Sequence, residues 1–140
     1  MAEPRPRHRL VAMPVIGDER GLLLFAETRA QVPFDIERLF VLFDLPDGAH
    51  RGAHAHRRQH QFLMMLAGSC TVTVDDGLSR TTVPLDSPST ALYVPPMLWL
   101  DLADFAAGSI CGVLTSGVYD ATDYIRDRVE FNQLSARLIA

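Results

Sequence analysis

Two histidines, His54 and His56, are the residues of this sequence best suited to chemistry, because a single residue separates them. In a β-strand alternate side chains point to the same face, so both imidazoles would project from one wall while Ala53 and Ala55 face the other way. Histidine has an unperturbed pKa close to neutrality, and a pair of imidazoles suits either proton transfer or metal ligation. The spacing therefore predicts a site on a strand, with two alternatives for its chemistry.

The elements that must position this pair have the pattern of short strands. Apolar or alternating runs recur between turn signals, at residues 22–27, 39–45, 61–66, 70–74, 90–94 and 109–115. Asp76-Gly77, between two runs rich in threonine and valine, is a strong hairpin signal. Only residues 121–140 have helical spacing, with Phe131, Leu134 and Leu138 on one face. We expect an all-β fold in which the strands close into a barrel or sandwich, followed by a short C-terminal helix.

Composition narrows the classes of function. The 140 residues are 48% hydrophobic, which predicts one domain over residues 1–140. The net charge of -4 and the scattered arginines argue against a nucleic-acid partner. No apolar run is long enough to span a bilayer, and the N-terminal residues lack the apolar core of a signal peptide, so we expect no membrane association and a cytoplasmic location. Cys70 and Cys111 lie in apolar runs and are expected to be buried thiols.

The spacing around the histidine pair resembles the first motif of the cupin β-barrels. Five residues separate Gly48 from His54, four separate His56 from Gln61, and six separate Gln61 from Gly68. Metal-binding cupins have a glutamate at the position of Gln61, and their second motif supplies a further histidine that residues 95–99 lack. A neutral amide is a poor ligand for a divalent transition metal, so the resemblance favours a site without a metal.

A longer resemblance covers nearly the whole chain. The sequence is similar to the sugar 3,4-ketoisomerases, which include the dTDP-4-keto-6-deoxyglucose 3,4-ketoisomerases and related WxcM-like domains. The matching blocks are residues 17–21, 51–56, 61–63, 68–69, 75–77, 92–96 with Trp99, and 119–127. The resemblance implies a single cupin-type antiparallel β-barrel, or jelly roll. It also implies a homodimer that exchanges N-terminal strands, for which residues 10–16 are the candidate segment.

The same resemblance implies roles for individual residues. His54 matches the general base that acts at carbon, and His56 matches the imidazole that moves a proton between two oxygens. The reaction it implies needs no cofactor and no metal. Arg20 and Arg51 would hold the diphosphate of a dTDP-linked 4-keto-6-deoxy sugar, because guanidinium groups match phosphate oxygens. The expected substrate-binding set also includes Gln61, together with Tyr93 and Trp99, which would line the barrel mouth.

Two positions depart from the family pattern. Phe40 stands where many relatives carry a tyrosine, and Leu100 stands where they carry a histidine or arginine. These departures leave the C4 configuration of the product open, and the nucleotide and the downstream sugar are open as well. Two alternative functions therefore stay open. One is a non-catalytic nucleotide-sugar-binding domain, and the other is a metal-dependent cupin enzyme that uses His54, His56 and His60.

Overall fold

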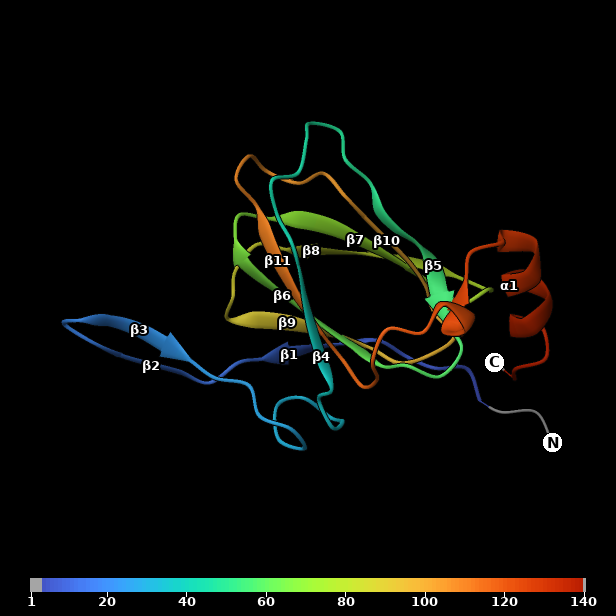
Figure 1. The fold of residues 1–140 in the computed structure, drawn as a ribbon, viewed down its shortest axis with the longest axis horizontal. Helices are drawn as coiled ribbons and strands as arrows, with labels where there is room; N and C mark the ends of the chain where they lie inside the picture. Colours follow the sequence, from blue (N-terminus) through green and yellow to red (C-terminus); the bar gives the residue numbers. More distant parts are fainter. Residues whose placement is uncertain (1–3, 140) are drawn as a thin grey trace.

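The computed structural model describes residues 4–139, which form two five-stranded antiparallel sheets and a separate two-stranded hairpin (Figure 1). The first sheet has the order β1 (Arg9–Ala12), β9 (Thr90–Val94), β6 (Gln61–Ala67), β11 (Ile110–Thr115) and β4 (Arg38–Leu42). The second has the order β12 (Tyr124–Ile125), β5 (Arg51–His56), β10 (Trp99–Ala103), β7 (Cys70–Asp75) and β8 (Arg80–Leu85). The predicted all-β class is confirmed.

The main hydrophobic core lies between the two sheets, and β6 shows how the sequence builds it. Leu63 and Met65 point into this core together with side chains from β7, β9, β10 and β11. Phe62 points to the opposite face of the sheet, where it packs with Val32 and Phe34 from the loop that precedes β4. Both faces of β6 are therefore buried from Gln61 to Met65, which explains the apolar residues at consecutive positions there.

A third apolar cluster lies outside the second sheet, beneath the C-terminal helix α1 (Arg128–Ser135). Phe131 of α1 packs there on Ala55 and Ile125. The helix is shorter than the predicted 121–140. Residues 121–123 form a 3₁₀ helix, η1 (Ala121–Asp123), and the next two residues pair with the edge of β5 as strand β12. The Asp127 side chain then caps the first turn of α1.

The hairpin of β2 (Val15–Asp18) and β3 (Gly21–Leu24) projects away from the two sheets, at the opposite end of the molecule from α1 (Figure 1). Strand β1 pairs with β9 of its own chain. Of the candidate exchange segment 10–16, residues 10–12 thus lie in β1 and residues 15–16 lie in this hairpin. Leu22 is 82% exposed on it.

Two smaller expectations are confirmed by the fold. The Asp76-Gly77 turn does connect two paired strands, β7 and β8. Cys70 and Cys111 are both buried free thiols. Within the described part of the chain, none of the helices has the length and apolar character that crossing a bilayer requires.

Candidate active site

A cavity of about 370 Å³ opens between the two sheets. One wall comes from β4, β6 and β11 of the first sheet, and the other from β5, β10 and residues 124–126. His54, Gln61 and Arg51, all predicted site residues, line this cavity. Inward-facing alternate residues of the facing strands supply the rest of the wall.

The backbone of β5 is irregular just before His54. Gly52 has φ +91°, and a Cβ atom added there would lie 2.8 Å from the Leu100 carbonyl oxygen. Ala53 also has a left-handed backbone, with φ +55°, and the pairing of β10 with β5 shifts register between Leu100 and Asp101. Glycine is the residue that tolerates such a close approach and such a φ. The Arg51-Gly52 dipeptide is thus the bend that leads the strand into the site.

His54 has a fixed tautomer. Its Nδ1 lies 2.9 Å from the backbone carbonyl oxygen of Gly52. A carbonyl oxygen can only accept a hydrogen bond, so Nδ1 carries the proton and donates. The other ring nitrogen, Nε2, keeps its lone pair. His54 therefore presents a proton acceptor from the cavity wall.

The surroundings of His54 keep this base neutral. Burial lowers the pKa of His54 to about 4, and the nearby His56 acts in the same direction. A charged imidazolium is disfavoured because the site withdraws it from water. At neutral pH the ring is consequently ready to accept a proton.

His56 lies behind His54, and is only 4% exposed. The two rings meet edge to face with centroids 5.1 Å apart, which places the predicted pair side by side. Nδ1 of His56 lies 3.0 Å from Oδ2 of Asp123, and Nε2 has no hydrogen-bond partner among residues 4–139. Burial lowers the pKa of His56, while the hydrogen bond to Asp123 opposes that change.

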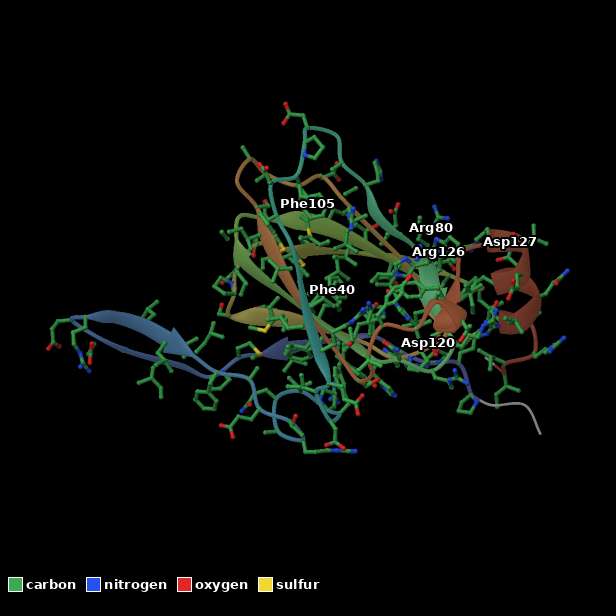
Figure 2. All side chains as sticks on the ribbon, in the orientation of Figure 1. Phe40, Arg80, Phe105, Asp120, Arg126 and Asp127 are labelled. Atoms are coloured by element: carbon green, nitrogen blue, oxygen red, sulfur yellow. The ribbon has the colours of Figure 1, made fainter. Side chains whose placement is uncertain are left out.

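Three arginines, Arg38, Arg51 and Arg126, contribute to the cavity wall, and no aspartate or glutamate of the described chain does. Figure 2 shows Arg126 on the segment that follows β12, where its guanidinium lies 4.4 Å from the ring centroid of Tyr124. The cavity is therefore cationic in a chain of net charge -4. Guanidinium groups gathered in this way favour an anionic ligand such as a diphosphate.

Arg38, Tyr124 and Arg126 were not in the predicted site. Tyr124 and Arg126 belong to the matching block at residues 119–127, so the family resemblance already pointed to that segment. Arg38 had no such signal, because its position in the cavity depends on which face of β4 points inward.

Three predicted binding residues lie elsewhere in this chain. Trp99 packs outside the second sheet, 5.5 Å from the ring of Phe131, because its neighbour Leu100 takes the inward position on β10. Tyr93 lies on the outer side of the first sheet, where its hydroxyl is 2.7 Å from Nδ1 of His60. The structure thus corrects the expectation that Tyr93 and Trp99 line the barrel mouth.

Arg20 is the third of these residues. It lies at the tip of the β2–β3 hairpin, where it pairs with Asp18 at 2.6 Å and both side chains are exposed. The structure does not bring Arg20 to the cavity of its own chain.

Phe40 and Leu100, the two departures from the family pattern, both line the cavity. Figure 2 marks Phe40 on β4, and Leu100 is 3% exposed. The wall is apolar at the two positions where relatives carry polar groups. Across residues 4–139 no three histidine, cysteine, aspartate or glutamate side chains are grouped so that they could share a metal ion. His60 lies with Tyr93, away from His54 and His56.

The fold defines a cupin-like antiparallel β-barrel with a cationic cavity between its two sheets. Residues 6–136 match the family model described as FdtA: WxcM-like, C-terminal. The chain belongs to this family. It is 38% identical, over 131 residues and 94% of each chain, to the TDP-4-oxo-6-deoxy-alpha-D-glucose-3,4-oxoisomerase of Aneurinibacillus thermoaerophilus.

Solved structures of similar proteins support the same family. The sugar 3,4-ketoisomerase QdtA from Thermoanaerobacterium thermosaccharolyticum, in complex with TDP, has a TM-score of 0.90 and 32% identity over 93% of this chain and 95% of that one. The TDP-quinovose 3,4-ketoisomerase WlaRB from Campylobacter jejuni has a TM-score of 0.87 and 36% identity over 90% and 97% of the two chains. The protein is a sugar 3,4-ketoisomerase.

Proposed function

We propose that the substrate is a dTDP-linked 4-keto-6-deoxyhexose, which the enzyme converts into its 3-keto isomer. The proposal rests on one observation. The imidazole of His54, which keeps a lone pair on Nε2, lines a cavity whose wall also contains three arginines. A nucleotide sugar offers the matching groups, because its diphosphate is anionic and its C3 hydrogen is acidified by the neighbouring ketone. QdtA has been solved with TDP-4-keto-6-deoxyglucose bound, which supports the same substrate class here.

The proposed reaction begins with His54. Nε2 removes the proton from C3, and the electron pair of that C–H bond forms the C3=C4 double bond as charge moves onto the C4 oxygen. The product of this step is an enediolate, which positive charge in the cavity stabilises. The proton then returns to C4 from the His54 imidazolium, and no group outside the substrate and the protein is consumed.

A second proton must move from the C3 oxygen to the C4 oxygen. We assign this transfer to His56, whose ring lies 5.1 Å from that of His54. Arg51 and Arg126, which both line the cavity, would bind the diphosphate, and Gln61 would hydrogen-bond a sugar hydroxyl. No cofactor is required, because the ketone itself supplies the electron sink.

The decisive test is hydrogen exchange. The protein is incubated with dTDP-4-keto-6-deoxyglucose in deuterated water, and the sugar is followed by NMR. We expect deuterium at the carbon positions and accumulation of the 3-keto isomer. Binding without exchange would instead identify a non-catalytic nucleotide-sugar-binding domain.

The pH dependence should report the lowered pKa of His54. The base must be unprotonated, so kcat/KM should fall as the pH drops through the pKa of His54 in the free enzyme, at about 4. For a histidine with an unperturbed pKa, this fall in kcat/KM would be centred near about pH 6.5. The measurement is a pH profile of kcat/KM, with circular dichroism at each pH to confirm that the protein is folded. A fall in kcat/KM centred near pH 6.5 would contradict the lowered pKa of His54.

We also propose a homodimer in which the β2–β3 hairpin packs on the partner. Leu22 and Leu23 are exposed on the hairpin, and Leu39 and Val41 are exposed on edge strand β4. Exposed edge strands and apolar patches are normally covered by a partner.

Replacing Leu22 and Leu23 by aspartate should give a monomer at micromolar concentration, measured by light scattering beside the wild-type dimer. A wild-type monomer would contradict the proposal.

We propose the cytoplasm as the compartment of this protein, which the free thiols of Cys70 and Cys111 support.

A further inference from the structure

Asp123 is a buried acid that the proposed reaction does not use directly. It lies at the end of η1 and is 1% exposed. Its Oδ1 accepts a hydrogen bond from the backbone N–H of Arg58 at 2.8 Å, and its Oδ2 accepts one from the N–H of Gln59 at 3.1 Å. The backbone carbonyl of Asp123 in turn accepts from the N–H of Arg57 at 2.8 Å. The turn after β5 therefore clamps this side chain in one orientation.

Two side chains also contact the carboxylate of Asp123: Nε of Arg58 lies 3.8 Å from Oδ1, and Nδ1 of His56 lies 3.0 Å from Oδ2. As a carboxylate, Asp123 offers only acceptors, so Nδ1 of His56 must carry the proton and donate. The neutral ring then has its lone pair on Nε2, the buried nitrogen without a partner among residues 4–139. A buried acceptor that no protein group satisfies is poised for a transferred proton.

We propose that Asp123 is the positioning residue of the reaction, holding His56 in the tautomer whose Nε2 can accept a proton and stabilising the imidazolium that forms. The catalytic consequence of this inference rests on the proposed function. The assignment of the His56 tautomer does not depend on that function. The same C-terminal segment supplies Tyr124, whose ring packs against that of His56 with the two centroids 4.4 Å apart. One stretch of chain, 67 residues from His56 in sequence, thus sets its orientation.

Asp123→Asn is the informative substitution because an amide cannot reproduce these contacts. If its oxygen takes the Oδ2 position, its NH₂ group faces the N–H of Arg58, and two donors oppose each other. If the NH₂ group takes the Oδ2 position, it opposes the N–H of Gln59, and it can donate to Nδ1 of His56 only when the ring proton lies on Nε2. The ring then has no lone pair where the proton must arrive.

Asp120→Asn is the matched control. Asp120 lies three residues away on the same segment, and its Oδ1 accepts from the N–H and hydroxyl of Thr122. Asparagine keeps an oxygen for this cap and is itself a favoured N-cap residue. The substitution breaks a 3.7 Å ion pair with Arg58, whose side chain is exposed. This variant removes the same charge without touching His56.

The experiment combines ¹⁵N NMR of the histidine rings with steady-state kinetics. We expect wild-type His56 to be protonated on Nδ1, and Asp123→Asn to move the proton to Nε2. We also expect kcat to fall about a hundred-fold or more while KM stays within a few-fold, because proton transfer is impaired and binding is not. Asp120→Asn should resemble the wild type in both measurements.

The wild-type tautomer decides the matter even if Asp123→Asn does not fold. Wild-type His56 protonated on Nε2 would overturn the proposal, as would a folded Asp123→Asn variant with unchanged kcat. If the wild type proves inactive on every sugar nucleotide, the proposed function fails. The ¹⁵N spectrum then still shows whether Asp123 sets the tautomer.

Discussion

Replacing His54 with asparagine is expected to abolish ketoisomerisation while leaving nucleotide binding intact. Asparagine approximates the shape of the ring and can still donate toward the Gly52 carbonyl, but it has no basic nitrogen to receive the C3 proton. General acid–base catalysis is worth roughly a hundred- to ten-thousand-fold, so kcat should fall within that range. The measurement is turnover of dTDP-4-keto-6-deoxyglucose, together with the Kd for TDP from calorimetry.

His60→Asn is the control for this prediction. His60 bonds to Tyr93 outside the cavity, so its replacement tests whether losing any partly buried imidazole is enough to impair turnover. We expect activity close to that of the wild type. Near-full activity of His54→Asn would remove His54 from its role as the base, and loss of TDP binding would show that the ring serves binding instead.

Replacing Phe131 with alanine is expected to cause the largest loss of stability in the C-terminal segment. The ring is fully buried, at 0% exposure, and it fills the space between α1 and the outer face of the second sheet. Removing a buried phenylalanine typically costs about 3–5 kcal/mol, because transfer free energy is lost and a cavity remains. The free energy of unfolding should fall by about that amount in urea denaturation.

Val129→Ala on the same helix is the matched control. Val129 is 62% exposed, so the change should lie within about 0.5 kcal/mol of the wild type. Trp99, the single tryptophan, packs 5.5 Å from Phe131 and reports this region by fluorescence. A loss below about 1 kcal/mol in Phe131→Ala would mean that α1 contributes little to the fold.

We expect Phe131→Ala to lower activity as well. Ala55 and Ile125, beneath Phe131, alternate along their strands with His56 and Tyr124. Loosening the outer cluster therefore loosens the inner face that carries the site. This consequence links a packing contact on the outside of the barrel to the chemistry inside it.

The features of this protein that depend on local sequence pattern were predictable from its residues alone. Alternation in β5 predicts that His54 and His56 lie together, and the structure places their rings 5.1 Å apart. The strand runs and the Asp76-Gly77 turn were predictable for the same reason, because strand and turn preferences act over a few residues. The spacing from Gly48 to Gly68 and the longer resemblance predicted the cupin-type barrel and the ketoisomerase family.

The tertiary structure decided which face of each strand points inward. Alternation puts Trp99 and Leu100 on opposite faces of β10, but both are apolar, so the pattern could not say which one reaches the cavity. The same ambiguity hid Arg38 on β4. Asp123 belongs to the matching block at residues 119–127, but its role could not be predicted, because it contacts His56 across 67 residues of sequence and only chain folding brings such distant positions together. Local sequence pattern thus predicted that the two histidines lie together. The groups that surround and orient them were set by long-range packing.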